Sequence, residues 1–256
     1  MILDELAAHA EERVKRDMEI TSLEDVRRAA MEARKGDFRF EKALKKGRAV
    51  IAEVKRASPS KGMISEDFPY IDIAKEYEAY GADCISCLTE PKWFLGSDEI
   101  FKEIRAAVSI PMLRKDFTVH EYQIYQAKLM GADAVLLICA LLDGDTLAKY
   151  IDICDELGIT ALTETHSKDE IEKAVSSGAR VIGVNNRDLR NFTVDRGNAA
   201  GLRGYIPEDR IFVSESGITT PEEAAQMFAD GAHAVLIGEA LMKCADKKGF
   251  LAAANC

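Results

Sequence analysis

The feature that most constrains the fold is a motif that recurs four times at nearly equal intervals. Each copy has Gly-Ala, a short polar spacer and an apolar run rich in Val, Ile or Leu. The copies begin at Gly81, Gly131, Gly178 and Gly231, which places them 50, 47 and 53 residues apart. Helix-compatible sequence precedes each glycine, and glycine readily takes the left-handed conformation that ends a helix. Because the apolar run that follows is typical of a buried parallel strand, each copy predicts a helix that leads into a strand.

Four further apolar segments alternate with these copies, at residues 49–54, 110–115, 159–164 and 210–215. Together the two sets predict eight strands, centred near residues 51, 85, 112, 136, 161, 182, 212 and 236. The mean step of about 26 residues fits one strand, one helix and two short loops. Eight evenly spaced units predict an α/β protein with a (β/α)8 TIM-barrel fold. An open doubly wound sheet is disfavoured, because the glycine-rich nucleotide-binding turn G-x-G-x-x-G is absent.

The domain organisation follows from the length. A chain of 256 residues matches a single barrel of this kind, which commonly has about 250 residues. We predict one domain over residues 1–256. Its parts are an N-terminal helical extension that caps the barrel (1–47), the barrel itself (48–245) and a C-terminal tail (246–256).

The charge balance and the lack of long apolar stretches exclude several classes of protein. The net charge of −10 argues against a nucleic-acid binder, which needs a basic face to replace phosphate counterions. A pocket inside an acidic protein can still be basic. The first twenty residues carry charges throughout, which is unlike a signal peptide. The longest apolar run, residues 134–142, is far shorter than the roughly 20 residues that span a bilayer. We therefore expect a cytoplasmic protein with no nucleic-acid or membrane partner.

The cysteines and histidines indicate neither a disulfide framework nor a metal site. The six cysteines are spread along the chain and are interpreted as reduced, mostly buried thiols. Cys84 and Cys87 lie in a predicted strand, where positions i and i+3 point to opposite faces and cannot share a metal. The histidines have no zinc-ligand spacing, and we interpret His166 as a surface or hydrogen-bonded residue. The sequence therefore predicts no metal.

Charged and amide side chains gather at the carboxyl ends of the predicted strands, where TIM barrels have their active sites. The candidates at these ends are Glu53, Lys55, Glu90, Lys115, Asp116, Glu164, Asn185, Asn186, Arg187, Glu215 and Ser216. Polar groups in a barrel cost free energy unless they are paired or used. Lysines together with glutamates suit proton transfer and carbonyl chemistry, and a Schiff-base lysine is the competing interpretation. The lack of G-x-S-x-G disfavours an acyl-transfer hydrolase.

A second pattern, after the last two predicted strands, indicates phosphate binding. Gly217 follows the seventh strand, and Thr220 and Pro221 form a typical helix start. Gly238 follows the eighth strand directly. Glycines there allow backbone N–H groups to approach an anion, and this is the position of the phosphate site in many barrels. Glycines also occur in tight turns that bind no ligand. The prediction therefore rests on finding glycines after both of the last two strands.

Several motifs resemble the indole-3-glycerol phosphate synthase family in its monofunctional form. They occur in the expected order at nearly every predicted strand: IAEVKRASPSKG (51–62), LTEPKWFLGS (88–97), PMLRKDF (111–117), GADAVLLI (131–138), GVNNRDL (183–189), VSESGI (213–218) and LIGEALM (236–242). The first and third are the most specific. Two local departures are TETH at residues 163–166, in place of the more usual E-V-H-like sequence, and Glu239, near a position where many members have serine.

The resemblance implies a carboxy-lyase of tryptophan biosynthesis. Its members convert 1-(2-carboxyphenylamino)-1-deoxyribulose 5-phosphate into indole-3-glycerol phosphate by ring closure, decarboxylation and dehydration. It also implies that no cofactor is used and that the partner is a small phosphorylated substrate. We expect a monomer or a weak homo-oligomer.

The resemblance also implies roles for residues of this chain. Lys115 is the implied general acid, and Lys55 holds the carboxylate or hydroxyls and donates a proton in the dehydration. Glu164 is the implied base or iminium stabiliser. The remaining residues of the polar ring are Glu53, Asn185, Glu215 and Ser216. The implied phosphate contacts are Ser58, Arg187, Gly217, Gly238 and Glu239. The implied wall around the anthranilate ring is Phe94, Phe117, Leu136, Leu189 and Ile218.

Three other functions remain open on the sequence. A barrel isomerase such as phosphoribosylanthranilate isomerase commonly uses Cys and Asp rather than two lysines. A Schiff-base aldolase would use Lys55 or Lys115 as a nucleophile. A phosphate-ligand binder without activity would keep the fold and the phosphate site alone.

Overall fold

The computed structural model describes residues 2–188 and 193–255 of the chain. Eight parallel strands form a closed barrel, in the order β1-β10-β9-β8-β7-β6-β5-β4. The barrel strands are β1 (Ala49–Val54), β4 (Cys84–Leu88), β5 (Met112–Lys115), β6 (Ala134–Ile138), β7 (Thr160–Thr165), β8 (Val181–Asn185), β9 (Ile211–Glu215) and β10 (Ala234–Ile237). All eight predicted strands are present at the predicted centres. The (β/α)8 prediction is therefore confirmed.

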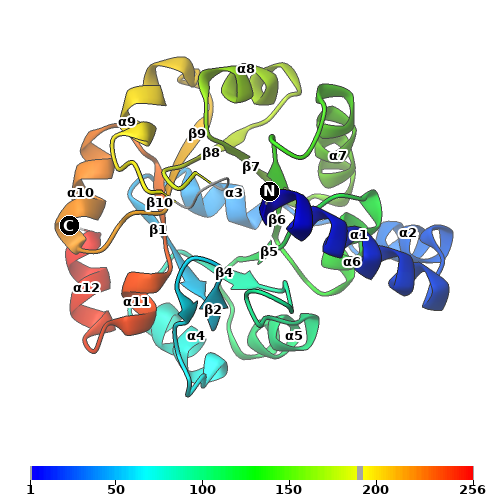
Figure 1. Cartoon of the computed structure of the whole chain (residues 1–256), viewed down its shortest axis with the longest axis horizontal. Coiled ribbons are helices and arrows are strands. Elements are labelled where there is room, and N and C mark those ends of the chain that lie inside the picture. Colours follow the sequence, from blue (N-terminus) through cyan, green and yellow to red (C-terminus); the bar gives the residue numbers. More distant parts are fainter. Residues whose placement is uncertain (1, 189–192, 256) are drawn as a thin grey trace.

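Helices surround the barrel, as Figure 1 shows. Those that follow the barrel strands are α4 (Tyr70–Ala79), α5 (Asp98–Ala107), α6 (Glu121–Leu129), α7 (Gly144–Leu157), α8 (Lys168–Ser176), α9 (Asn198–Leu202) with a short 3-10 turn (Arg203–Tyr205), α10 (Pro221–Ala229), α11 (Glu239–Lys243) and α12 (Lys247–Ala254). The four repeat glycines end helices with φ between 84° and 95°, as the repeat predicts. Thr220 caps α10 in a capping box with Glu223, and Pro221 opens the helix. The segment 246–256, predicted as a tail, contains α12, which packs against α10 and α4.

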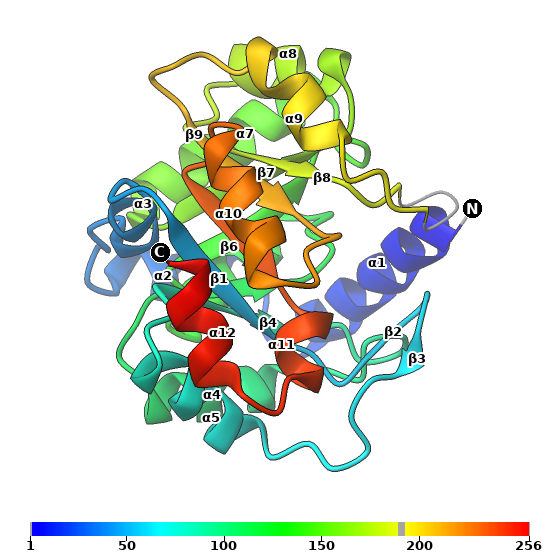
Figure 2. The same ribbon diagram turned by 90° about the vertical axis from the view of Figure 1, so that its left-hand side faces the viewer.

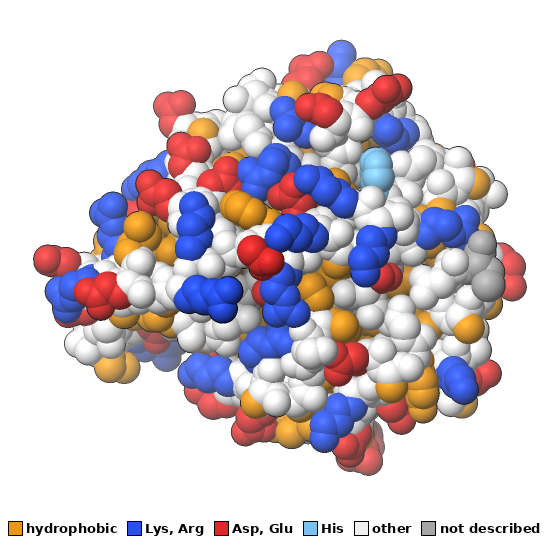
Figure 3. Space-filling view, turned by 180° about the vertical axis from the view of Figure 1, so that it is seen from behind, with side chains coloured by type: hydrophobic (Ala, Val, Ile, Leu, Met, Phe, Trp, Pro, Cys, Tyr) orange, Lys and Arg blue, Asp and Glu red, His pale blue; other side chains and the backbone are white. Residues whose placement is uncertain are grey.

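The predicted N-terminal extension is helical and packs on the barrel. It consists of α1 (Ile2–Ile20), α2 (Leu23–Glu32) and α3 (Arg39–Leu44). Phe40 and Leu44 of α3 join the core inside the barrel at the amino ends of the strands, and Leu3 and Leu6 of α1 join the same core. Figure 2 shows α3 on one side of the barrel and α1 reaching toward the other. On the α3 side, Lys and Arg side chains are interspersed with Asp and Glu (Figure 3).

Alternation along the strands divides the core into an inner and an outer layer. In β1, Ile51 faces the barrel interior, whereas Val50 and Ala52 pack against the surrounding helices. In β4, Cys84 belongs to the inner layer and Cys87 to the outer layer, as expected for positions i and i+3 of a strand. Both thiols are buried and free of disulfides.

A small hairpin after β1 was not predicted. Two-residue strands β2 (Ala57–Ser58) and β3 (Gly62–Met63) pair antiparallel and carry the segment that follows Lys55. Figure 2 shows this hairpin on the same side of the barrel as the start of α1. Because it directly follows the carboxyl end of β1, it lies on the side where the carboxyl ends of the barrel strands open.

Candidate active site

A cavity of about 1080 Å³ opens at the carboxyl ends of the barrel strands. Sixteen of the seventeen predicted site residues line it, and they come from the eight barrel strands or the segments that follow them: Glu53, Lys55, Ser58, Phe94, Lys115, Phe117, Leu136, Glu164, Asn185, Arg187, Glu215, Ser216, Gly217, Ile218, Gly238 and Glu239. The seventeenth, Leu189, lies outside the described residues. The structure thus brings the predicted set together, while the role of each residue stays a prediction.

Lys115, at the end of β5, lies between two buried carboxylates. Its Nζ atom is 3.2 Å from Oε2 of Glu164 and 3.4 Å from Oε2 of Glu215. Burial disfavours the ammonium ion, but the charges of the two glutamates outweigh it and raise the pKa of Lys115. Lys115 is therefore protonated at neutral pH and holds a proton inside the cavity.

The same two carboxylates have different environments. Burial raises the pKa of both, and for Glu164 the nearby Lys115 and His166 more than offset it, so that its pKa is lowered. Burial and the charge of Glu164 disfavour the ionised form of Glu215. They raise its pKa to about 7, although Lys115 acts in the other direction. A pair of glutamates with pKa values moved apart in this way suits acid–base chemistry.

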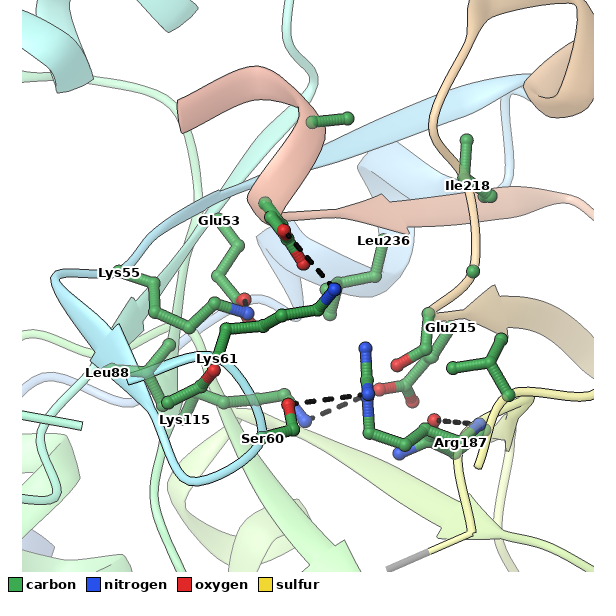
Figure 4. Close-up of a pocket in the computed structure, with 18 of the residues that line it drawn as sticks. Glu53, Lys55, Ser60, Lys61, Leu88, Lys115, Arg187, Glu215, Ile218 and Leu236 are labelled. Atoms are coloured by element: carbon green, nitrogen blue, oxygen red, sulfur yellow. Dashed lines mark hydrogen bonds and ion pairs between the residues drawn. The ribbon is translucent and has the colours of Figure 1, made fainter. Parts of the chain in front are cut away.

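Close backbone approach makes room for these carboxylates. Gly183 of β8 is paired in register with Glu164, and a Cβ atom on it would be 2.1 Å from Oε1 of Glu215. Gly238, which follows β10, is similarly close to a carboxylate of β1, since a Cβ atom on it would be 2.3 Å from Oε1 of Glu53. Glu53 itself forms an ion pair with Lys55. Figure 4 shows Glu53, Lys55, Lys115 and Glu215 directed into the cavity. The glycines at these two positions are therefore required by the polar ring.

The turn after β9 has a strained backbone. Ser216 has φ of 66°, which is uncommon for a residue other than glycine, and Gly217 follows with φ of 82°. The side-chain amide of Asn186 donates to the carbonyl of Ser216 over 3.1 Å and holds this turn. Strain that neighbouring residues hold in place is typical of functional sites, and this turn lines the cavity at the predicted phosphate position.

Further basic residues at the cavity mouth were missed by the sequence reasoning. Lys61, Arg196 and Lys243 line it in addition to the predicted Arg187, together with the hydroxyl residue Ser60. Nη1 of Arg187 donates to Oγ of Ser60 over 3.4 Å and links the β8 loop to the hairpin (Figure 4). Glu239 forms an ion pair with Lys243 at 2.8 Å and lies 3.8 Å from Lys61. Ser60 and Lys61 lie within the motif IAEVKRASPSKG, whereas Arg196 and Lys243 lie 11 and 6 residues beyond the strands that precede them and carry no comparable signal.

An apolar wall faces the polar ring. The rings of Phe94 and Phe117 have centroids 6.1 Å apart and are inclined by 43°. Leu136 of β6 and Ile218 of the β9 loop line the same cavity. A buried, partly aromatic wall of this kind suits a flat apolar ring.

Two charged residues at the strand ends have structural partners. Glu90 accepts hydrogen bonds from the backbone N–H groups of Trp93 and Phe94 at 2.7 and 3.0 Å, and so fixes the Phe94 loop. Asp116 forms a two-point ion pair with Arg13 of α1 at 2.6 and 3.1 Å. Both carboxylates therefore have partners that hold the site in place, although Asp116 also lines the cavity.

Within residues 2–188 and 193–255, no group of three or more His, Cys, Asp or Glu side chains is arranged to hold a metal ion. Within the same residues, no helix combines the length and the apolar character that crossing a membrane requires.

Comparison with known proteins assigns the family. The family model described as indole-3-glycerol phosphate synthase matches residues 3–253. Relatives named indole-3-glycerol phosphate synthase include that of Ruminiclostridium cellulolyticum, 53% identical over 98% of both chains. Another is that of Lacticaseibacillus casei, 45% identical over 99% of this chain and 98% of the other.

A solved structure supports the fold independently. Thiamine phosphate pyrophosphorylase from Pyrococcus furiosus superposes with a TM-score of 0.61, covering 80% of this chain and 93% of the other. Its sequence identity of 15% makes it a match of fold alone. The family match over nearly the whole length, with the motifs placed around one cavity, shows that this chain belongs to the indole-3-glycerol phosphate synthase family.

Proposed function

We propose that this chain converts 1-(2-carboxyphenylamino)-1-deoxyribulose 5-phosphate into indole-3-glycerol phosphate with the residues of the cavity described above. As a member of its family it is a carbon–carbon lyase of the carboxy-lyase class in tryptophan biosynthesis. The observation that carries the catalytic proposal is Lys115, a buried ammonium ion placed between Glu164 and Glu215 at the bottom of a cavity with an aromatic wall.

Lys115 is assigned as the general acid of ring closure. It gives a proton to the ketone oxygen of the substrate while the ring carbon that bears the carboxylate bonds to the ketone carbon. The nitrogen lone pair supplies electrons to the ring, so that a positive iminium develops. Glu164 and Glu215 stabilise this charge, and the surplus negative charge that they hold around Lys115 matches the cation in the transition state.

Decarboxylation and dehydration follow from this intermediate. The carbon–carbon bond to the carboxylate breaks, carbon dioxide leaves and the bonding electrons return to the ring. The new hydroxyl then leaves as water with a proton from Lys55. A carboxylate accepts the proton that is lost from the neighbouring carbon of the new five-membered ring. Glu53 forms an ion pair with Lys55 and therefore orients it. Asn185, whose Oδ1 accepts from the backbone of Arg187 at 2.9 Å, and Ser216 complete the contacts to the hydroxyls.

The substrate phosphate is assigned to the mouth of the cavity. Ser58, Arg187, Gly217, Gly238 and the backbone N–H of Glu239 provide the contacts, supported by their common position around the cavity. Leu189 belongs to the proposed wall around the anthranilate ring with Phe94, Phe117, Leu136 and Ile218. No metal or organic cofactor takes part in this proposal.

The remaining features of the proposal concern the whole chain. We place the enzyme in the cytoplasm, as a monomer or weak homo-oligomer that binds neither membrane nor nucleic acid. Residues 1–256 act as one domain with the cap 1–47, the barrel 48–245 and the tail 246–256. Sedimentation of the purified chain tests the oligomeric state.

A single assay tests the proposed activity. The substrate is added to the purified chain, and the fluorescence of the indole product is followed. Fluorescence that rises with turnover supports the proposal. Binding of the substrate without any indole fluorescence would contradict it and would favour a ligand binder with the same fold.

A further inference from the structure

The imidazole ring of His166 lies next to Glu164 and is not among the residues that line the cavity. Its side chain is 18% exposed, and its Nε2 atom is 3.7 Å from Oε1 of Glu164. His166 does not line the cavity, so it does not touch a ligand bound there. Because residues i and i+2 of an extended strand point the same way, the end of β7 places both side chains on one side.

The two facing atoms share an unusual property. Nε2 of His166 and Oε1 of Glu164 are both buried, and neither has a hydrogen-bond partner within residues 2–188 and 193–255. Most buried polar atoms in native proteins are satisfied. A shift of less than about 1 Å would bring the two into hydrogen-bond distance and satisfy both at once.

A second carboxylate holds the other side of the ring. Nδ1 of His166 is 3.6 Å from Oε2 of Glu170, and the same oxygen accepts the backbone N–H of His166 at 2.7 Å. Asn198 donates its side-chain amide to the His166 carbonyl over 3.4 Å. Lys115, Glu164, His166 and Glu170 therefore form a row of alternating charge when the ring is protonated.

We propose that His166 is a positioning residue of the active site, whose imidazolium bridges Glu170 and Oε1 of Glu164 and leaves Oε2 of Glu164 directed at Lys115 and the substrate. The inference rests on the proposed function, because it assigns His166 a role through Glu164. Without this contact Oε1 of Glu164 has no fixed partner, and the carboxylate is held less firmly in its orientation toward Lys115.

The charges around the ring agree with this protonation state. Burial disfavours the imidazolium, but the nearby carboxylates of Glu170, Glu164 and Glu215 raise the pKa of His166. Glu164 faces Lys115 and His166, whose charges lower its pKa against burial. Removal of the His166 cation should therefore raise the pKa of Glu164.

Kinetics of His166 variants test the proposal. His166→Ala is expected to lower kcat by about 10- to 100-fold, the effect of losing a hydrogen bond to a charged group. KM should stay within about twofold, since the ring touches no ligand. The ionisation of Glu164, which contributes to the acidic limb of the kcat profile, should move to higher pH. His166→Gln keeps an N–H donor and should recover part of kcat.

The control is His233→Asn at the opposite end of the barrel. Nδ1 of His233 accepts the backbone N–H of Phe212 at 3.1 Å, and the Asn carbonyl can replace it, so kcat and the pH profile should not change. Unchanged kcat in His166→Ala, or a higher KM at unchanged kcat, would overturn the proposal. If His166→Ala does not fold, an acidic limb of His166→Gln at the wild-type pH overturns it equally.

A measurement on the free enzyme separates this inference from the proposed function. Selective ¹⁵N labelling of histidine, with His166→Gln to assign the signal, follows the protonation of His166 without substrate. A titration midpoint above 6.5 supports the bridge, and one at or below 6.5 overturns it whatever the enzyme catalyses. Absence of turnover in the wild type would instead contradict the proposed function.

Discussion

Gly183 offers the sharpest structural test of the polar ring. It lies in β8, where its backbone is compatible with any residue, yet a Cβ atom there would be 2.1 Å from Oε1 of Glu215. Ordinary contact begins at about 3.4 Å, so Gly183→Ala must displace the carboxylate by about 1.3 Å. The variant therefore displaces the Glu215 carboxylate without replacing any residue of the polar ring.

The magnitude follows from the ion pair with Lys115. Moving Oε2 of Glu215 from 3.4 Å to about 4.7 Å from Nζ weakens the attraction by about 1.4 kcal/mol at an effective dielectric constant of about 20. If this attraction contributes to transition-state stabilisation, kcat falls about tenfold. A rise in indole fluorescence under saturating substrate measures kcat directly.

Gly201→Ala is the matched control for this experiment. Gly201 lies inside α9, and a Cβ atom there would meet open space, so kcat should not change. Alanine in a helix favours stability by up to about 1 kcal/mol over glycine. The reasoning is refuted if Gly183→Ala keeps kcat within about twofold, or if its crystal structure shows Glu215 undisplaced.

Three further predictions concern charge. Glu164→Gln should lower kcat by about 10²- to 10⁴-fold at constant substrate affinity, as measured by steady-state kinetics and calorimetry; a loss under tenfold would remove Glu164 from acid–base catalysis. Arg13→Ala should cost about 3–5 kcal/mol in urea unfolding, because it leaves Asp116 buried without its two-point partner, whereas the exposed Arg28→Ala should cost less than about 1 kcal/mol. Burial opposes the ionised form of Asp116, but Arg13 and Arg114 lower its pKa below 3.8, so its contribution is complete above that pH and is lost as pH falls through the lowered value. The unfolding free energies of wild type and Arg13→Ala should therefore converge below pH 3.8, and a constant difference would contradict this linkage.

The sequence was sufficient for the barrel and for the position of the cavity. Strands buried on both faces are continuous apolar runs, and the glycines that end the helices require a left-handed backbone, so both signals are local. Because parallel strands in a barrel all open at one end, residues as distant as Lys115 and Glu215 could be placed together from their strand positions alone.

Contacts across strands were not accessible in the same way. The need for Gly183 depends on where the Glu215 carboxylate of the neighbouring strand ends, a distance that no sequence period encodes. Asp116 belongs to the same set of strand-end charges as Lys115, yet its carboxylate is paired with Arg13 of α1. The β2–β3 hairpin is too short to show alternation, so the position of its Lys61 at the cavity mouth was missed.

The central claim is that Lys115 is the general acid of ring closure, and Lys115→Met tests it most directly. Excess variant is mixed with substrate in a single-turnover experiment, and indole fluorescence and substrate binding are measured together. The account predicts retained binding with turnover reduced by at least about 10²-fold, since a proton donor acts mainly in the transition state. Indole formation within about tenfold of the wild-type rate would contradict it.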